Sequence, residues 1–225
     1  MKKSTKVIAM MMIGIFLCML DTTVMNIALP AIQTGLNTDL THLSWALNIY
    51  TVLFASLAIP LGRLADVWGR GRMYLIGLGL FGIGSLTSGL SLSVGLLITG
   101  RAIQSIGAAI VFPASMTIGI QSVALSRHTG VIASLGVMQG LAAALGPTIG
   151  GAVTQFWGWR GIFLINVPLV AVALCGCIAW LSWRHPSHGQ VKLDLGGSAL
   201  VMTTLLALTL VLVKGNDWEW TSRVV

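Results

Sequence analysis

Residues 62–72 have the sequence GRLADVWGRGR and separate two long apolar stretches of the chain. The segment places three arginines around one acidic residue, Asp66, and its glycines allow a tight turn. Asp66 can accept hydrogen bonds from arginine side chains or from the start of a helix. Basic residues are also the ordinary composition of loops on the cytoplasmic side of a membrane. On either interpretation, the segment is a short connection between two apolar helices.

The composition of the whole chain indicates an integral membrane protein. Of its 225 residues, 56% are hydrophobic and 8% are charged, and the mean hydropathy is +0.90. A soluble domain usually carries about 25% charged residues. The net charge of +7 would suggest nucleic-acid binding in a soluble protein, but here the basic residues lie between apolar stretches. We therefore expect the lipid bilayer, and no nucleic acid, as a partner.

Seven apolar stretches are long enough to cross a bilayer as helices, which takes about 20 residues each. They lack the two-residue alternation of barrel strands, so we expect an all-α membrane protein. The first stretch continues past Asp21 to Pro30 without a clear cleavage site, which favours a retained span over a signal peptide. The stretches cover about 7–29, 44–62, 73–91, 95–117, 131–154, 162–183 and 195–213.

The distribution of basic residues predicts the orientation of the spans. With the N-terminus in the cytoplasm, nine lysines and arginines lie on the cytoplasmic side and three on the outer side, while Arg101 lies inside a span. Cytoplasmic loops of membrane proteins carry such an excess of positive charge. We therefore expect a multi-pass protein of the cell membrane whose N-terminus and 63–72 loop are cytoplasmic.

Asp21 and Arg101 are ionisable residues within apolar stretches, where charges are costly and usually functional. At about 1.5 Å per residue, Asp21 lies about 20 Å above the cytoplasmic edge of its span, and Arg101 lies about 10 Å below the outer edge of its own. In an apolar core about 30 Å thick, the two charges fall at similar depth. Burial favours a neutral Asp21 and Arg101 favours a charged one, so Asp21 is a candidate proton carrier. A structural ion pair is the alternative.

Polar residues near Arg101 and small residues on the fifth stretch extend these expectations. Gln104 and Ser105 follow Arg101 by three and four residues, so they share its helix face. Gly136 with Gly140, and Gly146 with Gly150, form two G-x-x-x-G pairs that permit close contact with another helix. Pro147 lacks a backbone donor and is expected to kink this helix.

The 62–72 segment resembles the signature loop of the major facilitator superfamily, G-x-L-a-D-r-x-G-r-k/r. It departs from that pattern at Val67 and Gly71. The resemblance implies a conformational or gating role for the residues of the loop that carry it, namely Gly62, Asp66, Gly69, Arg70 and Arg72.

Four further segments resemble the fourteen-helix drug:proton antiporter branch of that superfamily. Residues 20–30 are similar to its first-helix motif, and residues 101–109 to its fourth-helix motif, with Ser105 where glycine is usual. Residues 159–168 are also similar to the branch. The fifth-helix antiporter motif is matched by Gly146, Pro147, Gly150 and Gly151, with Ala142 where a further glycine is usual.

The resemblance implies an architecture and a function. Residues 1–183 would form the N-terminal six-helix unit of a transporter, residues 184–194 a cytoplasmic linker, and residues 195–225 a seventh transmembrane helix with an outer segment. A C-terminal half would be missing from this chain. The implied function is export of hydrophobic or cationic drugs in exchange for protons. From the similar depth of the two charges, we predict that Asp21 carries the coupling proton and that Arg101 tunes its affinity.

The sequence offers little support for other kinds of activity. Residues 77–82 match G-x-G-x-x-G, but they lie inside an apolar stretch, where close helix packing explains the glycines better than a dinucleotide does. No nucleophile–base set, metal-ligand spacing or nucleotide loop is evident, so we expect neither an enzyme nor a cofactor, and a proton gradient as the energy source. A truncated membrane protein that does not transport, or a proton-coupled transporter of another small molecule, remains open.

Overall fold

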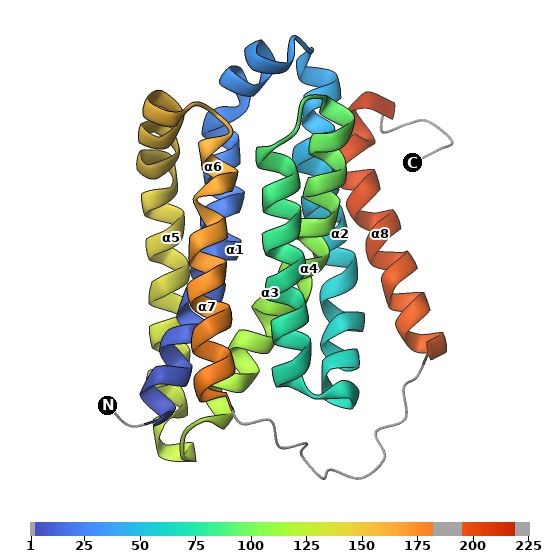
Figure 1. Cartoon of the computed structure of the whole chain (residues 1–225). Coiled ribbons are helices and arrows are strands. Elements are labelled where there is room, and N and C mark those ends of the chain that lie inside the picture. The colour runs from blue at the N-terminus through green and yellow to red at the C-terminus, as the bar shows by residue number, and fades with distance from the viewer. Residues whose placement is uncertain (1–2, 182–194, 219–225) are drawn as a thin grey trace.

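The computed structural model describes residues 3–181 and 195–218, and within these ranges it consists of helices without strands (Figure 1). The long helices stand side by side, and the N-terminus lies at the same end of the bundle as the α2–α3 turn. The elements are α1 (Lys3–Leu36), α2 (Leu40–Trp68), α3 (Arg70–Gly89), α4 (Val94–Gln121), η1 (Leu125–Arg127), α5 (His128–Trp157), α6 (Gly161–Leu164), α7 (Asn166–Trp180) and α8 (Leu195–Trp218).

Five helical segments are long and apolar enough to cross a membrane: Lys3–Leu36, Leu40–Trp68, Val94–Gln121, Leu125–Trp157 and Gly161–Trp180. The third predicted span forms α3, whose glycines and serines make it less apolar. The seventh forms α8, whose apolar part is the shorter Gly196–Leu212. The expectation of an all-α membrane protein is therefore confirmed. The predicted linker 184–194 lies outside the described residues.

The sixth predicted span is interrupted near its start. α6 ends at Leu164 and α7 begins at Asn166, with Ile165 as a joint between them. Pro168 has no N–H to donate to the carbonyl of Leu164, which explains a break at this point. The joint places Asn166 at the first position of α7, deep in the bundle.

Glycines let α3 and α4 approach closely. A Cβ atom built on Gly107 would lie 2.6 Å from the carbonyl oxygen of Gly77, and one on Gly84 would lie 2.7 Å from the Cα of Gln104. A Cβ on Gly77 itself would lie 2.9 Å from that of Ile110. Gly77 and Gly82 begin and end the G-x-G-x-x-G segment of residues 77–82. Gly77 packs against α4 and Gly82 against Val170 of α7, as expected of a helix-packing segment.

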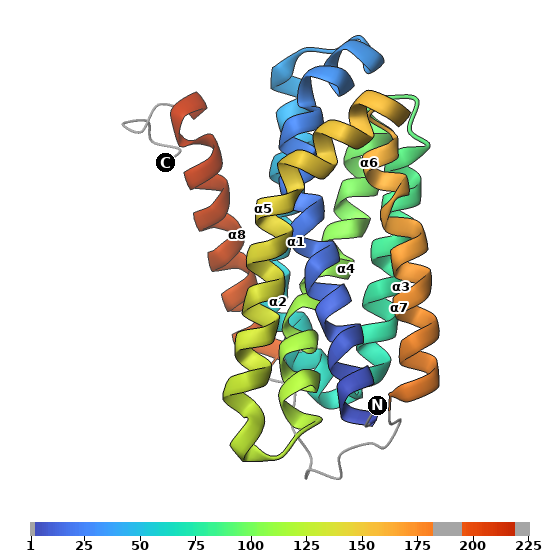
Figure 2. The same cartoon turned by 90° about the vertical axis from the view of Figure 1, so that its left-hand side faces the viewer.

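The remaining helices pack on α4 or on one another. α1 packs against α5, α4 and α7, while α2 packs against α4, and α8 lies beside α2 at the edge of the bundle (Figure 2). The main apolar core gathers Met11, Ile15, Tyr74, Leu78 and Phe81 from α1 and α3. A second cluster, around Leu20, Met25 and Phe163, fills the other end of α1. Asp21 lies next to the boundary of the two clusters along α1, directly after Leu20 of the second cluster.

Candidate functional site

The structure brings Asp21 of α1 and Arg101 of α4 together as a buried ion pair. Nη1 of Arg101 donates to Oδ2 of Asp21, and the two side chains are 1% and 2% exposed for Arg101 and Asp21 respectively. A buried charge is costly unless it is paired and hydrogen-bonded. Asp21 and Arg101, for which the sequence predicted a similar depth in the membrane, are thus in direct contact.

Two amides complete the shell of the Asp21 carboxylate. Nε2 of Gln104 donates to Oδ1 at 2.7 Å, and Nδ2 of Asn166 donates to the same oxygen at 3.2 Å. Gln104 also accepts a hydrogen bond from Nη1 of Arg101 at 2.9 Å. We call Asp21, Arg101, Gln104, Asn166 and Ser85 the polar network, because hydrogen bonds join all five.

Ser85 of α3 ties this polar network to the α6–α7 segment. Its hydroxyl accepts from Gln104 at 3.2 Å and from Asn166 at 3.0 Å, and it donates to the carbonyl of Phe163 at 2.9 Å. Ser85 is 0% exposed. The polar network therefore joins α1, α3, α4 and the start of α7.

The remaining surroundings of Arg101 are apolar or neutral. Its guanidinium carbon lies 4.2 Å from the ring centroid of Tyr50 and 5.9 Å from that of Phe163, and its Nε donates to the carbonyl of Ala46 at 3.3 Å. Ser105, which the sequence placed on the same face, donates to the carbonyl of Tyr50 at 2.6 Å and does not join the polar network. These hydrogen bonds from Arg101 and Ser105 of α4 to backbone carbonyls of α2 hold the two helices together.

One polar atom of the polar network has no partner. Oδ1 of Asn166 is buried without a hydrogen bond, although Asn166 is only 1% exposed. Neither Asn166 nor Ser85 was expected from the sequence to have a functional role. The signal for Asn166 was an amide inside a strongly apolar stretch, whereas Ser85 lies in a glycine- and serine-rich stretch and has no distinguishing feature.

The second candidate region is the α2–α3 turn. Nε and Nη2 of Arg70 each lie 2.7 Å from Oδ1 of Asp66, and the two side chains are 28% and 29% exposed. Gly69 between the helices has a φ of 99°, which favours glycine, and its N–H donates to the carbonyl of Ala65. The turn therefore consists of Gly69 alone and is stabilised by the Asp66–Arg70 ion pair.

Three expectations about this turn were too broad. Gly62 lies inside α2, and a Cβ there would meet no atom within 4 Å, so it contributes neither to the turn nor to close packing among the described residues. Gly71 lies in α3 and packs against Leu181. Of the three arginines, Arg70 alone forms an ion pair with Asp66 in the described part of the chain.

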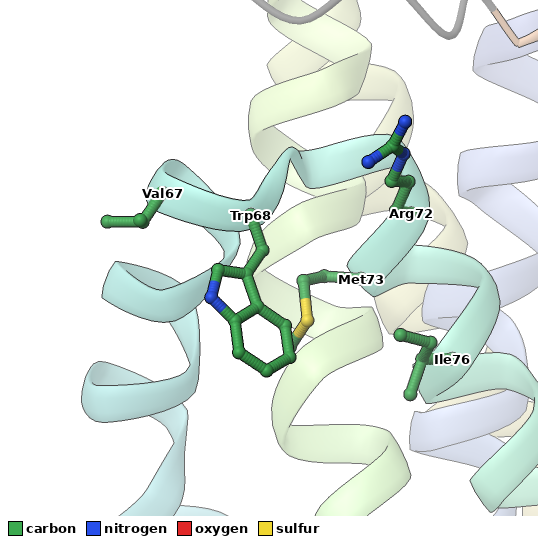
Figure 3. Close-up of a pocket in the computed structure, with 5 residues that line it drawn as sticks. All are labelled: Val67, Trp68, Arg72, Met73 and Ile76. Atoms are coloured by element: carbon green, nitrogen blue, oxygen red, sulfur yellow. The ribbon is translucent and has the colours of Figure 1, made fainter. Parts of the chain in front are cut away.

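Arg72 lies instead beside a shallow apolar hollow next to the turn. The hollow has a volume of about 350 Å³ and is lined by Val67, Trp68, Arg72, Met73 and Ile76. In Figure 3 the Trp68 ring lies beside the Met73 side chain, while the guanidinium of Arg72 points away from them. Trp68 is 56% exposed, so the hollow opens outward from the bundle.

The glycines of α5 differ in what they contact. A Cβ on Gly146 would lie 2.6 Å from Cβ of Thr23, and one on Gly150 would lie 3.2 Å from Cα of Val24, so this pair seats α5 against α1. Gly136, Gly140 and Gly151 meet nothing within 4 Å among the described residues. The expected close contact therefore holds for one of the two pairs.

Pro147 lies between the seated glycines without ending the helix. α5 is continuous from His128 to Trp157, and its last turns lean away from the line of its first ones (Figure 2). Pro147 cannot donate to the carbonyl four residues earlier, which weakens the helix at this point. Residues 146–151 thus combine close packing against α1 with a helix that lacks one backbone hydrogen bond.

The polar network can exist in two charge states. With Asp21 ionised, three donors compensate its charge; with Asp21 protonated, Arg101 loses its counter-ion and the carboxyl needs an acceptor for its O–H. Among the described residues, no group of three His, Cys, Asp or Glu side chains is arranged to hold a metal ion. The groups that this site offers are one carboxylate, one guanidinium, two side-chain amides and one hydroxyl, contributed by α1, α3, α4 and α7.

A bundle of apolar helices around a buried, hydrogen-bonded ion pair is typical of multi-pass membrane proteins, among them transporters. The chain belongs to the Major Facilitator Superfamily, whose sequence profile matches residues 11–219.

Several curated relatives of this chain carry names of resistance or export proteins. The methylenomycin A resistance protein of Bacillus subtilis (strain 168) is 36% identical over 223 residues, covering 97% of this chain and 47% of the relative. The cephamycin export protein CmcT of Amycolatopsis lactamdurans is 35% identical, covering 93% and 44%. The lincomycin resistance protein of Streptomyces lincolnensis is 36% identical, covering 84% and 39%. The chain spans about half the length of these relatives, or less.

Solved structures show the same fold at lower identity. A peptide transporter in complex with sulfate has a TM-score of 0.69 and 19% identity, covering 95% of this chain and 47% of that chain. A human organic anion transporter has a TM-score of 0.65 and 15% identity, covering 92% and 55%. The bundle is therefore that of about half of a major facilitator transporter.

Proposed function

We propose that this chain forms the N-terminal half of a proton-coupled exporter of hydrophobic or cationic drugs in the cell membrane. The observation that carries the proposal is the polar network around Asp21. A carboxylate and its partner at 1–2% exposure inside an apolar bundle are energetically costly, and such charges usually serve a function. The relatives named above, two resistance proteins and one export protein, support drugs as the substrate class.

In this proposal Asp21 carries the coupling proton and Arg101 tunes its affinity. Arg101 stabilises the ionised form of Asp21, while burial favours the neutral form. A change in water access during transport would shift the balance between the two. No cofactor is needed, since the proton gradient supplies the energy.

The turn and α5 have conformational roles in the same proposal. The Asp66–Arg70 pair holds one conformation at the cytoplasmic end, together with Gly69 and the neighbouring Arg72. α5 moves about its seat on α1, where Gly146 and Gly150 permit close contact and Pro147 weakens the helix. Residues 1–183 act as the six-helix unit, with 184–194 as linker and 195–225 as the seventh helix and outer segment. The N-terminus is cytoplasmic, as the basic residues indicate.

The proposal is tested by expressing the complete reading frame in a drug-sensitive host and measuring resistance and efflux over a panel of compounds. We expect resistance to lipophilic or cationic compounds, and efflux from everted vesicles that stops when the pH gradient is collapsed. Residues 1–225 alone are expected to give no efflux, because alternating access in this fold requires two halves.

Two other results would replace the proposal. Proton-coupled movement of another small molecule without drug efflux would indicate a different substrate class. A complete reading frame that holds no second half, with no transport of any compound, would indicate a membrane protein that does not transport.

A further inference from the structure

Protonation of Asp21 creates a hydrogen-bond donor that the polar network must satisfy. A carboxylate only accepts, but a carboxyl group also carries one O–H, which is costly to leave unpaired when buried. Asp21 is 4% exposed, so the acceptor has to come from its neighbours when water is excluded.

Most of these neighbours are not placed to accept the O–H. Arg101 has no acceptor atom. The Gln104 amide turns Nε2 toward Asp21 and Oε1 toward Arg101, and the two acceptor sites of the Ser85 hydroxyl are taken by Gln104 and Asn166. Oδ1 of Asn166 alone among the side-chain oxygens of the polar network has no partner.

We propose that Asn166 is the proton-sensing partner of Asp21: it donates through Nδ2 while Asp21 is ionised, and its amide turns to accept the Asp21 O–H through Oδ1 once Asp21 has bound a proton. This inference rests on the proposed function and deepens it by naming a second residue of the coupling site. Asp21 takes up one proton from water. No other covalent bond forms or breaks.

The amide turn is physically simple. The terminal torsion of asparagine is broad and roughly two-fold, so half a turn exchanges oxygen and nitrogen within the same volume. One amide atom of Asn166 lacks a partner before the turn and one lacks a partner after it. Within the Asn166 amide, the turn therefore leaves the number of unpaired atoms unchanged.

The turn also changes what Ser85 can do. In the ionised state Nδ2 of Asn166 donates to Ser85 at 3.0 Å, and Ser85 donates to the carbonyl of Phe163 at 2.9 Å. After the turn, Oδ1 faces Ser85 and can accept its O–H, which releases the Phe163 carbonyl. Phe163 lies in α6, two residues before the joint at Ile165. Proton binding at Asp21 of α1 thereby changes the hydrogen bonding next to the α6–α7 joint.

Few other ionisable groups in the described residues face Asp21. Arg101 of α4 is the charged one. Cys18 of α1 and Tyr50 of α2 lie near, with the Tyr50 hydroxyl donating to the carbonyl of Cys18 at 3.4 Å. Thiol and phenol side chains are ordinarily neutral at physiological pH. A pH-dependent change at Asn166 is thus attributable to Asp21.

The test compares Asn166→Val with Asn166→Thr in the complete protein. The two side chains have nearly the same shape, but threonine keeps a hydroxyl that can donate and accept. Efflux driven by a pH gradient is measured in proteoliposomes, together with substrate exchange at equal pH, which needs no net proton movement. We expect Asn166→Val to lose about tenfold in driven efflux with exchange nearly unchanged, and Asn166→Thr to recover most of the loss.

An infrared pH titration supplies a readout that a merely structural role would not move. The carboxyl band of protonated Asp21, identified by its loss in Asp21→Asn, is expected to shift to higher wavenumber in Asn166→Val. In the unmodified protein, the amide band of Asn166 is expected to shift together with the appearance of the Asp21 carboxyl band.

Unchanged driven efflux and an unshifted carboxyl band in Asn166→Val would overturn the inference. If Asn166→Val does not fold, the amide band in the unmodified protein, assigned through Asn166→Thr, gives the decision. If the unmodified protein shows no efflux driven by a pH gradient, the proposed function fails instead, and the infrared titration still decides whether Asn166 follows Asp21.

Discussion

Two aspartate–arginine pairs occupy opposite environments in this bundle. Asp21 and Arg101 are 2% and 1% exposed and share their hydrogen bonds with two amides and a carbonyl, whereas Asp66 and Arg70 are 29% and 28% exposed and bond to one another. Water solvates the second pair whether it is closed or open, so it can break at little cost. The first pair cannot lose a partner without leaving a buried charge. The same residue types therefore suit a proton site in one place and a reversible fastening in the other.

The largest expected effect is the contrast between Arg101→Ala and Arg70→Ala. Arg101→Ala leaves Asp21 buried without its counter-ion and is expected to lower the free energy of unfolding by about 3–5 kcal/mol. Arg70→Ala is expected to cost less than about 1 kcal/mol. Thermal unfolding of the purified protein in detergent measures both. Equal losses would show that burial does not separate the two pairs.

The helix that carries Asp21 can be tested through its contact with α5. Gly146→Ala introduces a Cβ that would lie 2.6 Å from Cβ of Thr23, so we expect a loss of about 1–3 kcal/mol in unfolding free energy. Gly151→Ala is the matched control on the same helix, because its Cβ would meet nothing within 4 Å. It is expected to be neutral or stabilising, by up to about 1 kcal/mol. A control as damaging as Gly146→Ala would mean that α5 is not seated as described.

The exposed pair is expected to affect movement more than folding. In the complete protein, Asp66→Ala removes a charge-assisted hydrogen bond from one conformation, and transport should fall roughly tenfold. Substrate binding, measured by direct titration, should change little. A drop in binding as large as the drop in transport would argue against a gating role for the turn.

The smallest effect is expected at a third aspartate, which is more exposed than either of the others. Asp39 precedes α2, and its carboxylate accepts from the backbone N–H of His42 at 2.7 Å and from the His42 ring at 2.9 Å. These hydrogen bonds, the backbone one first, lower the pKa of Asp39 below its usual value. The stability that Asp39 contributes is therefore present above its usual pKa and is lost as pH falls through the lowered value.

We expect Asp39→Ala to lower the unfolding midpoint by a small amount at neutral pH, because α2 loses its N-cap. The difference from the unmodified protein should shrink in acid, where protonated Asp39 loses its charge but keeps a capping oxygen. Asp39→Asn, which keeps a capping oxygen, is the control. A difference that grew as pH fell would contradict this assignment.

Sequence patterns predicted the helical spans and the buried ion pair for physical reasons that are local. Apolar length marks a span, and a charge inside it has to find a partner. Gln104 followed from its position three residues after Arg101. Asn166 and Ser85 could not be assigned, because their part in the polar network depends on how α3 and α7 pack against α1. Gly62 and Gly136 were overinterpreted, since a glycine motif does not say which face of its helix meets a neighbour.

If Asp21 carries the coupling proton, binding of a drug should release that proton, and the release can be measured. The complete protein is purified in weakly buffered detergent, substrate is added, and the pH change is recorded for the unmodified protein and for Asp21→Asn. We expect proton release from the unmodified protein and none from folded Asp21→Asn. Normal release from folded Asp21→Asn would show that the proton is carried elsewhere and that the buried pair is structural.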